Sequence, residues 1–200
     1  MQGSKPVECE VLNVIQAAGI WPDCDDKTQL LQAIKQLTVS SLPSRQYFTE
    51  SAEFIVPEGV ENIRVTVAGA GGGGGLNGNP PSQKSGDGSA SSVTYGSLGI
   101  IAEGGEGGWS AKIDEDGASS GVASNGDLNL AGQGAVGGNG SVSVLGQTGG
   151  PGGNGGLAIK DLSVTAGEVF EIVVGKGGVA THQGLELNVG QDGYVILEWV

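Results

Sequence analysis

The stretch IRVTVAGAGGGGG, residues 63–75, decides the fold of this chain. Its first five residues alternate apolar and polar side chains, as a β-strand with one buried face does. The strand runs directly into a tract of glycine. The sequence before this junction has an ordinary composition, whereas glycine runs recur after it, over residues 104–108, 132–140 and 149–156.

Glycine sets this sequence apart from an average one. It supplies 40 of the 200 residues, and all but Gly3, Gly19 and Gly59 lie at or after Gly69. Average usage is about 7%, so the C-terminal two-thirds must have a special architecture. The chain lacks the strict glycine period and the proline of collagen. Its apolar residues, 38% of the total, cluster in strand-like runs, which predicts ordered structure rather than disorder.

The charge and the cysteines restrict the function classes. The formal net charge is −13, with nine Lys and Arg against 22 Asp and Glu, which argues against nucleic acid and anionic membranes as partners. No run of 18 apolar residues occurs, so we expect no membrane insertion, and the first ten residues lack the apolar core of a signal peptide. Cys9 and Cys24 are too few for a disulfide framework. We expect free thiols, with a bridge across a helical hairpin as the open alternative.

Two short helices are predicted before the β-rich part. Residues 7–18 place apolar side chains at helical spacing, and Gly19 suits the end of that helix. Asp25 or Asp26 can cap a second helix over residues 27–37.

The second helix carries an apolar stripe made of Leu30, Leu31, Ile34 and Leu37. Helices this short are marginal on their own and need a partner. A self-packed hairpin is one interpretation. We favour the other, in which residues 1–40 form an anchoring or oligomerisation segment, followed by a linker over residues 41–46.

Residues 47–200 are predicted to form one glycine-rich β domain. Many short strands separated by glycine turns indicate an antiparallel β-sandwich, so the fold class is mainly β after a helical hairpin. The expected strands cover residues 47–49, 53–56, 63–67, 91–95, 99–102, 110–113, 141–144, 156–160, 162–164, 169–174 and 194–200.

The glycine runs allow two interpretations. They could be mobile surface loops. Alternatively they pack side by side as polyglycine segments of the polyproline-II type, which hydrogen-bond sideways as collagen chains do. We favour the packed arrangement, because ordering so much glycine is entropically costly without a structural use.

No motif in the sequence supports catalysis. Residues 69–74 match the dinucleotide fingerprint G-x-G-x-x-G, but Pro80 and Pro81 prevent the helix that the fingerprint requires. Lys176 lacks the flanking residues of a P-loop, and a lone His182 cannot form a histidine-based metal site. The acidic residues 114–116 lack the spacing of a calcium loop. We therefore expect no enzyme activity, no cofactor and no metal.

Aromatic residues beside glycine are the remaining functional signal. Trp109 follows the run 104–108 and Tyr95 precedes Gly96, and such rings can stack on sugars. A core or interface position is equally open for both. With His182, expected in a surface loop, they are the candidate receptor contacts.

Four stretches together resemble the glycine-rich tail-fibre proteins of tailed bacteriophages. They are VLNVIQAAGIWPDCDDKTQLLQAI (residues 11–34), FIVPEGVENIRVTVAGAGGGG (54–74), LSVTAGEVFEIVVGKGG (162–178) and GYVILEW (193–199). The resemblance covers nearly the whole chain in order, although the long fibre shaft of that family is missing. Some phage adhesins are similar in using packed glycine helices.

The resemblance implies a virion protein of the tail or baseplate, assembled in the host cytoplasm and often homotrimeric. Such a protein is fixed at its N-terminus to baseplate or other tail proteins. Its distal part binds a bacterial surface polysaccharide or an outer-membrane protein. A structural baseplate connector without receptor binding is the alternative. A polysaccharide depolymerase is a third, but it needs a carboxylate pair that this sequence does not suggest.

Overall fold

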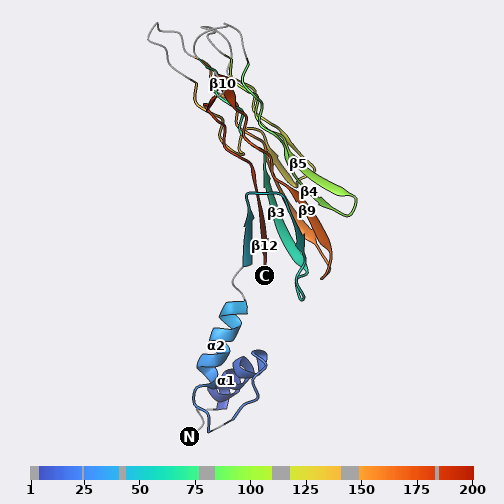
Figure 1. Ribbon diagram of the computed structural model, residues 1–200. Coiled ribbons are helices and arrows are strands. Elements are labelled where there is room, and N and C mark those ends of the chain that lie inside the picture. The colour runs from blue at the N-terminus through green and yellow to red at the C-terminus, as the bar shows by residue number, and fades with distance from the viewer. Residues whose placement is uncertain are drawn as a thin grey trace. The chain divides into compact units, whose positions relative to one another are not determined.

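The structure is a computed structural model that describes residues 5–23, 25–40, 44–76, 84–109, 118–140, 149–182 and 185–200. The chain divides into two compact units, Met1–Ser44 with Val200, and Arg45–Trp199. The first unit holds the helices and the second holds the β structure (Figure 1). The prediction of a mainly β chain with a short N-terminal helical hairpin is confirmed.

In the first unit, α1 (Lys5–Ala17) packs against α2 (Gln29–Ser40) around a small core. Ile15, Ala18 and Ala33 are its buried members. Gly19 ends α1 as predicted: its φ of +71° favours glycine, and the N–H of the next residue bonds back across the last turn. The predicted helix 7–18 is therefore displaced by one or two residues at each end.

The start of α2 is fixed by Asp26. Its Oδ1 accepts hydrogen bonds from the N–H (2.8 Å) and the hydroxyl (2.6 Å) of Thr28, and both bonds lower the pKa of the carboxyl. The helix continues to Ser40, beyond the predicted residue 37, since no glycine or proline interrupts it before Pro43. The predicted linker 41–46 is too long, because a strand already begins at Ser44.

The second unit contains two five-stranded sheets. The first has the order β1 (Ser44–Phe48), β12 (Tyr194–Trp199), β3 (Asn62–Ala68), β8 (Leu157–Ser163) and β7 (Leu128–Leu130). The second has the order β2 (Ala52–Ile55), β9 (Val169–Val173), β4 (Ser91–Tyr95), β5 (Leu98–Ala102) and β6 (Ala123–Ser124). A small hairpin joins β10 (Ala180–His182) to β11 (Leu185–Leu187).

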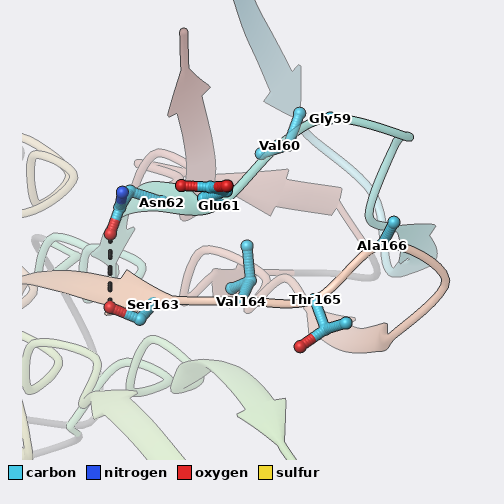
Figure 2. A pocket seen from close by; sticks show the side chains of 8 residues that line it. All are labelled: Gly59, Val60, Glu61, Asn62, Ser163, Val164, Thr165 and Ala166. Carbon is cyan, nitrogen blue, oxygen red and sulfur yellow. Dashed lines mark hydrogen bonds between the residues drawn. The ribbon is translucent and has the colours of Figure 1, made fainter.

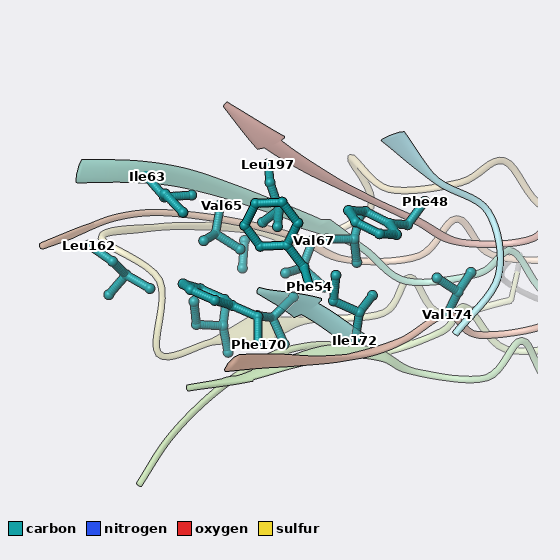
Figure 3. Packing of buried hydrophobic residues seen from close by; sticks show 14 of the residues in the cluster. Phe48, Phe54, Ile63, Val65, Val67, Leu162, Phe170, Ile172, Val174 and Leu197 are labelled. Atoms are coloured by element: carbon teal, nitrogen blue, oxygen red, sulfur yellow. The ribbon is translucent and has the colours of Figure 1, made fainter. Parts of the chain in front are cut away.

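The two sheets enclose one hydrophobic core, as the predicted antiparallel sandwich requires. Along β3 the side chains alternate, so that Ile63, Val65 and Val67 are buried while Arg64 is exposed. Phe54 makes edge contacts with Phe170, its register partner in the same sheet, and with Phe48 of the other sheet (Figure 3). The predicted strands 156–160 and 162–164 form one strand, β8, and the predicted strands 110–113 and 141–144 lie outside the described residues.

The glycine runs pack against one another and do not form separate surface loops. Strands of the sandwich continue into extended segments at one end of it, where residues 69–75 form a central segment. Six segments surround the central one as three antiparallel pairs. They are pair A (residues 85–90 and 103–109), pair B (134–140 and 149–156) and pair C (175–179 and 188–193).

Consecutive residues of the central segment bond to different pairs. Gly72 donates to Gly153 of pair B, Gly73 to Gly86 of pair A, and Gly74 to Asn188 of pair C, all at 2.8–2.9 Å. In return, Gly138, Gly108 and Gly178 donate to the carbonyl oxygens of Gly72, Gly73 and Gly71 at 2.7–2.8 Å. This three-residue repeat is that of a polyproline-II-type helix. Each face of the central segment thus binds both legs of one pair.

Every backbone polar group of residues 69–75 has a protein partner. The last two carbonyl oxygens accept from side chains, that of Gly74 from the hydroxyl of Ser85 and that of Gly75 from the amide of Asn188. This buried glycine tract therefore carries no unpaired amide, which is what a stable interior requires.

Candidate functional site

The glycine array separates the two ends of the second unit. At one end lie the end of β12 and the tight turns of the sandwich (Figure 1). At the other end the described segments stop at residues 76, 109, 140 and 182 and resume at 84, 118, 149 and 185. This end is here called the distal end. The sequence between these described segments contains less glycine than the array, as in SAKIDED over residues 110–116.

Each pair is closed along its outer side by one Asp or Asn side chain. The N–H of Gly107 donates to Asp87 (2.7 Å), that of Gly137 to Asn154 (3.0 Å), and that of Gly177 to Asp192 (2.8 Å). The acceptor lies on one leg and the donor on the other in all three pairs. At the outer surface no further backbone segment accepts a hydrogen bond from these three N–H groups, and the side-chain oxygens accept it instead. We call Asp87, Asn154 and Asp192 the sealing residues.

Lysine side chains support two of these contacts. Lys84 Nζ lies 2.8 Å from Asp87 and 3.8 Å from Glu106, and Lys176 Nζ lies 2.9 Å from Asp192. Lys176 and the N–H of Gly177 lower the pKa of Asp192. Asp87 also has a lowered pKa: burial opposes its ionisation, but Lys84 and the N–H of Gly107 outweigh that effect.

Trp109 and His182 lie toward the distal end. Trp109 ends the outer leg 103–109, forms a backbone bridge with Lys84, and accepts a bond from the N–H of Gly150 (2.8 Å). Its side chain is partly buried. His182 ends β10 and pairs with Leu185, so it lies in a short strand and not in the predicted loop. The side chain of His182 lies outside the described part of the chain.

Tyr95 lies at the opposite end, in the sandwich. Its ring stacks on Phe170 with 4.8 Å between centroids, and its hydroxyl bonds to the carboxylate of Glu168. That bond raises the pKa of Tyr95. The structure does not bring Tyr95 together with Trp109 and His182, and it gives the ring a packing role instead.

Two shallow hollows also lie at the sandwich end. One, of about 530 Å³, is lined by the β2–β3 turn with the start of β3 and by the end of β8 with the residues that follow it; Ser163 donates there to Asn62 at 3.2 Å (Figure 2). The other, of about 560 Å³, lies beside Tyr95 and Glu168. Within the described ranges, no group of three or more His, Cys, Asp or Glu side chains is arranged to hold a metal ion.

The predicted apolar stripe lies on α2 of the first unit. Leu30, Leu31 and Ile34 expose 36%, 57% and 45% of their surface, while Ala33 faces α1. The side chains of Leu37 and of both cysteines lie outside the description. Trp21, in the segment between the helices, is 86% exposed. An exposed apolar surface of this extent on so small a unit is typical of a protein interaction site. Neither described helix is long and apolar enough to cross a membrane.

Comparison with known proteins assigns no family: no protein-family model matches the chain, and no curated protein matches it significantly.

The role of Asp87, Asn154 and Asp192 was not predicted from the sequence, because each glycine run was considered separately. A signal for the array does exist, because Glu103-Gly-Gly-Glu106-Gly-Gly-Trp109 and Pro151-Gly-Gly-Asn154-Gly-Gly-Leu157 repeat every three residues. The non-glycine residue of each triplet points out of the array, and the two glycines face neighbouring segments.

Proposed function

We propose that this chain is a tail-fibre protein of a tailed bacteriophage that binds the host surface through its glycine-rich β domain. The observation that carries the proposal is the polarity of the second unit. The sandwich lies at one end of this unit, and at the distal end the described segments of the glycine array stop at residues 76, 109, 140 and 182. The glycine array stands between the two ends, and every backbone polar group of its central segment, residues 69–75, is hydrogen-bonded. Such an array makes a rigid support, and binding residues are often carried on segments positioned by a rigid support.

The first unit is proposed to attach the protein to the virion. The exposed Leu30, Leu31 and Ile34 would form the contact between copies of a homotrimer or with baseplate and other tail proteins. Leu37 is the fourth residue of the predicted stripe and belongs to the same proposed contact. Several copies held together would bind a surface of many identical receptors far more tightly than one copy does.

The receptor is proposed to be a bacterial surface polysaccharide or an outer-membrane protein. Trp109 is the described aromatic residue at the distal end, where its ring can stack on a sugar. The net charge of −13 weighs against nucleic acid as the ligand.

Binding of the labelled full-length protein to a panel of bacterial strains tests the proposal. We expect saturable binding to at least one strain, reduced several-fold by Trp109→Ala and unchanged by Tyr95→Phe, which alters the opposite end. If no strain binds the oligomeric protein, the receptor-binding role fails. Recovery of the protein bound to tail components would then support the structural connector.

A further inference from the structure

Neighbouring pairs around the central segment meet along three equivalent lines, which are defined by the backbone hydrogen bonds between the pairs and are here called grooves. In each groove, N–H groups of one pair bond to carbonyl groups of the next. Gly153 donates to Glu106 between pairs A and B, Gln191 to Val136 between B and C, and Ser89 to Lys176 between C and A, at 2.8–2.9 Å. The repeat of three residues therefore gives the array an approximate threefold arrangement about residues 69–75.

One of these grooves is filled by the chain itself. Residues 118–122 lie along the groove between pairs A and B, where Glu103 donates to Val122 (2.8 Å) and Glu106 to Ser119 (2.9 Å). Gly121 donates in the opposite sense to the carbonyl oxygen of Asn154 (2.8 Å). A Cβ on Gly121 would lie 2.2 Å from the carbonyl oxygen of Glu103, so the segment needs a glycine where it faces the groove.

The groove between pairs B and C offers the same groups. In pair B, the N–H groups of Ala135 and Gly138 donate to the central segment, and that of Gly137 donates to Asn154. The remaining N–H of each three-residue repeat, at Val136 and Asn139, therefore points outward. The N–H groups of Glu103 and Glu106 point outward in the same way in pair A. Among the described residues neither the N–H of Val136 nor that of Asn139 has a partner. In the groove between pairs A and B, the carbonyl oxygen of Asn154 accepts from Gly121 of the segment 118–122. By the same three-residue repeat, the carbonyl oxygens of Val189 and Asp192 face the groove between pairs B and C.

The rim of this groove is also apolar. Val136 and Val189 are 53% and 51% exposed, although valine is usually buried. The third groove, between pairs C and A, is flanked instead by Lys176, which is engaged with Asp192. The combination of aligned backbone donors and exposed valines distinguishes the BC groove.

We infer that the BC groove is a docking site for an extended segment of another polypeptide in the polyproline-II conformation, with glycine or alanine at every third residue. The occupant is defined by the segment 118–122, whose Ala118 and Gly121 take those positions in the equivalent groove. Binding would add a second outer segment to the ring of six, beside residues 118–122, by main-chain hydrogen bonds, as β-augmentation adds a strand to a sheet.

A peptide of four Gly-Ser-Pro triplets is the probe, because proline favours the required conformation and glycine can face the groove. Titrated into the ¹⁵N-labelled full-length protein, it should shift the amide signals of Val136 and Asn139 saturably. A Leu-Ser-Pro peptide, too bulky to enter, should not. Absence of saturable shifts with the glycine peptide, or shifts confined to Lys176 and Val179, would overturn the inference.

Val136→Pro, compared with Val136→Ala, separates the backbone donor from the side chain. Proline fits the outward position of a triplet, as the native Pro151 shows, and it removes the N–H together with the valine side chain. We expect at least tenfold weaker peptide binding with an otherwise unchanged amide spectrum. Val136→Ala keeps the N–H and should bind the peptide with an affinity within about threefold of that of the native chain. An equal loss of peptide affinity in both variants would refute binding through main-chain hydrogen bonds. If Val136→Pro does not fold, Asn139→Pro serves the same comparison at the second donor.

Discussion

The N–H of Gly72 lies 2.9 Å from the carbonyl oxygen of Gly153, and this contact leaves no room for a side chain on Gly72. A Cβ placed there would lie 1.9 Å from the carbonyl oxygen of Glu106. The obstructing atom belongs to the backbone of a segment that is itself bonded on several sides, so it cannot rotate away. The close spacing that satisfies every central amide is therefore the same feature that demands glycine.

Replacing Gly72 by alanine should destabilise the protein by about 3 kcal/mol or more, because overpacking here displaces backbone and breaks several hydrogen bonds. Gly150→Ala is the matched control. A Cβ at Gly150 would have its nearest neighbour at 3.8 Å, so the change should cost less than about 1 kcal/mol. Urea denaturation followed by circular dichroism measures both. Equal stability of the two variants would mean that the array is not packed as described.

Tyr95 should act on stability and not on receptor binding. Tyr95→Phe removes the bond to Glu168 but keeps the ring on Phe170, and should cost about 1 kcal/mol. Tyr95→Ala also removes the stacked ring and should cost about 3 kcal/mol. Urea midpoints check both values, and binding of folded Tyr95→Phe to bacterial cells should match that of the native chain. A loss of cell binding without a loss of stability would restore Tyr95 as a receptor contact.

Acid should weaken the sealing contact of pair C. The pKa of Asp192 is lowered in the folded state by Lys176 and the N–H of Gly177. A lowered folded-state pKa means that the unfolded chain takes up the proton more readily, so stability is present above pH about 4 and is lost as the pH falls below that value. Unfolding midpoints in urea between pH 6 and pH 3, in steps of about half a unit, should show this decrease.

Asp192→Asn isolates that contribution. The asparagine oxygen can still accept from Gly177, but it cannot titrate and does not pair with Lys176. The variant should therefore show a shallower loss of stability between pH 5 and pH 3 than the native chain. Parallel curves would assign the acid sensitivity to other carboxylates, such as Asp161, whose pKa Arg64 lowers.

The fold was largely predictable because its signals are local. The alternation in residues 63–67 identifies a strand with one buried face, and Gly19 and Asp26 mark the helix ends by backbone chemistry. The extension of α2 to Ser40 and the early start of β1 at Ser44 were missed. The apparent linker becomes an edge strand because β1 pairs with β12, which lies far away in the sequence, and the side chains of Arg45 and Glu198 bond across this pair.

The sequence predicts that the glycine segments pack together, but it does not predict how they are arranged. Packing of glycine segments follows from the need to pair their amides, but the sequence does not say that residues 69–75 lie at the centre. Glycine carries no side chain, so no pattern of apolar and polar residues distinguishes the central segment from an outer one. The separation of Tyr95 from Trp109 also depends on tertiary structure, since both residues simply follow or precede glycine in the sequence.

Leu31→Asp should disrupt the proposed assembly without unfolding the β unit. Leu31 is 57% exposed on α2, so the aspartate would be solvated in a single copy but buried in a contact between copies, where an unpaired charge is costly. Light scattering should give a homotrimer of three 19.8 kDa chains for the native protein and a single chain for the variant. Gln32→Asp places the same charge on an exposed neighbouring position outside the stripe and should leave the mass unchanged. A native protein that is already monomeric, or a variant that keeps the native mass, would remove α2 as the element of self-assembly.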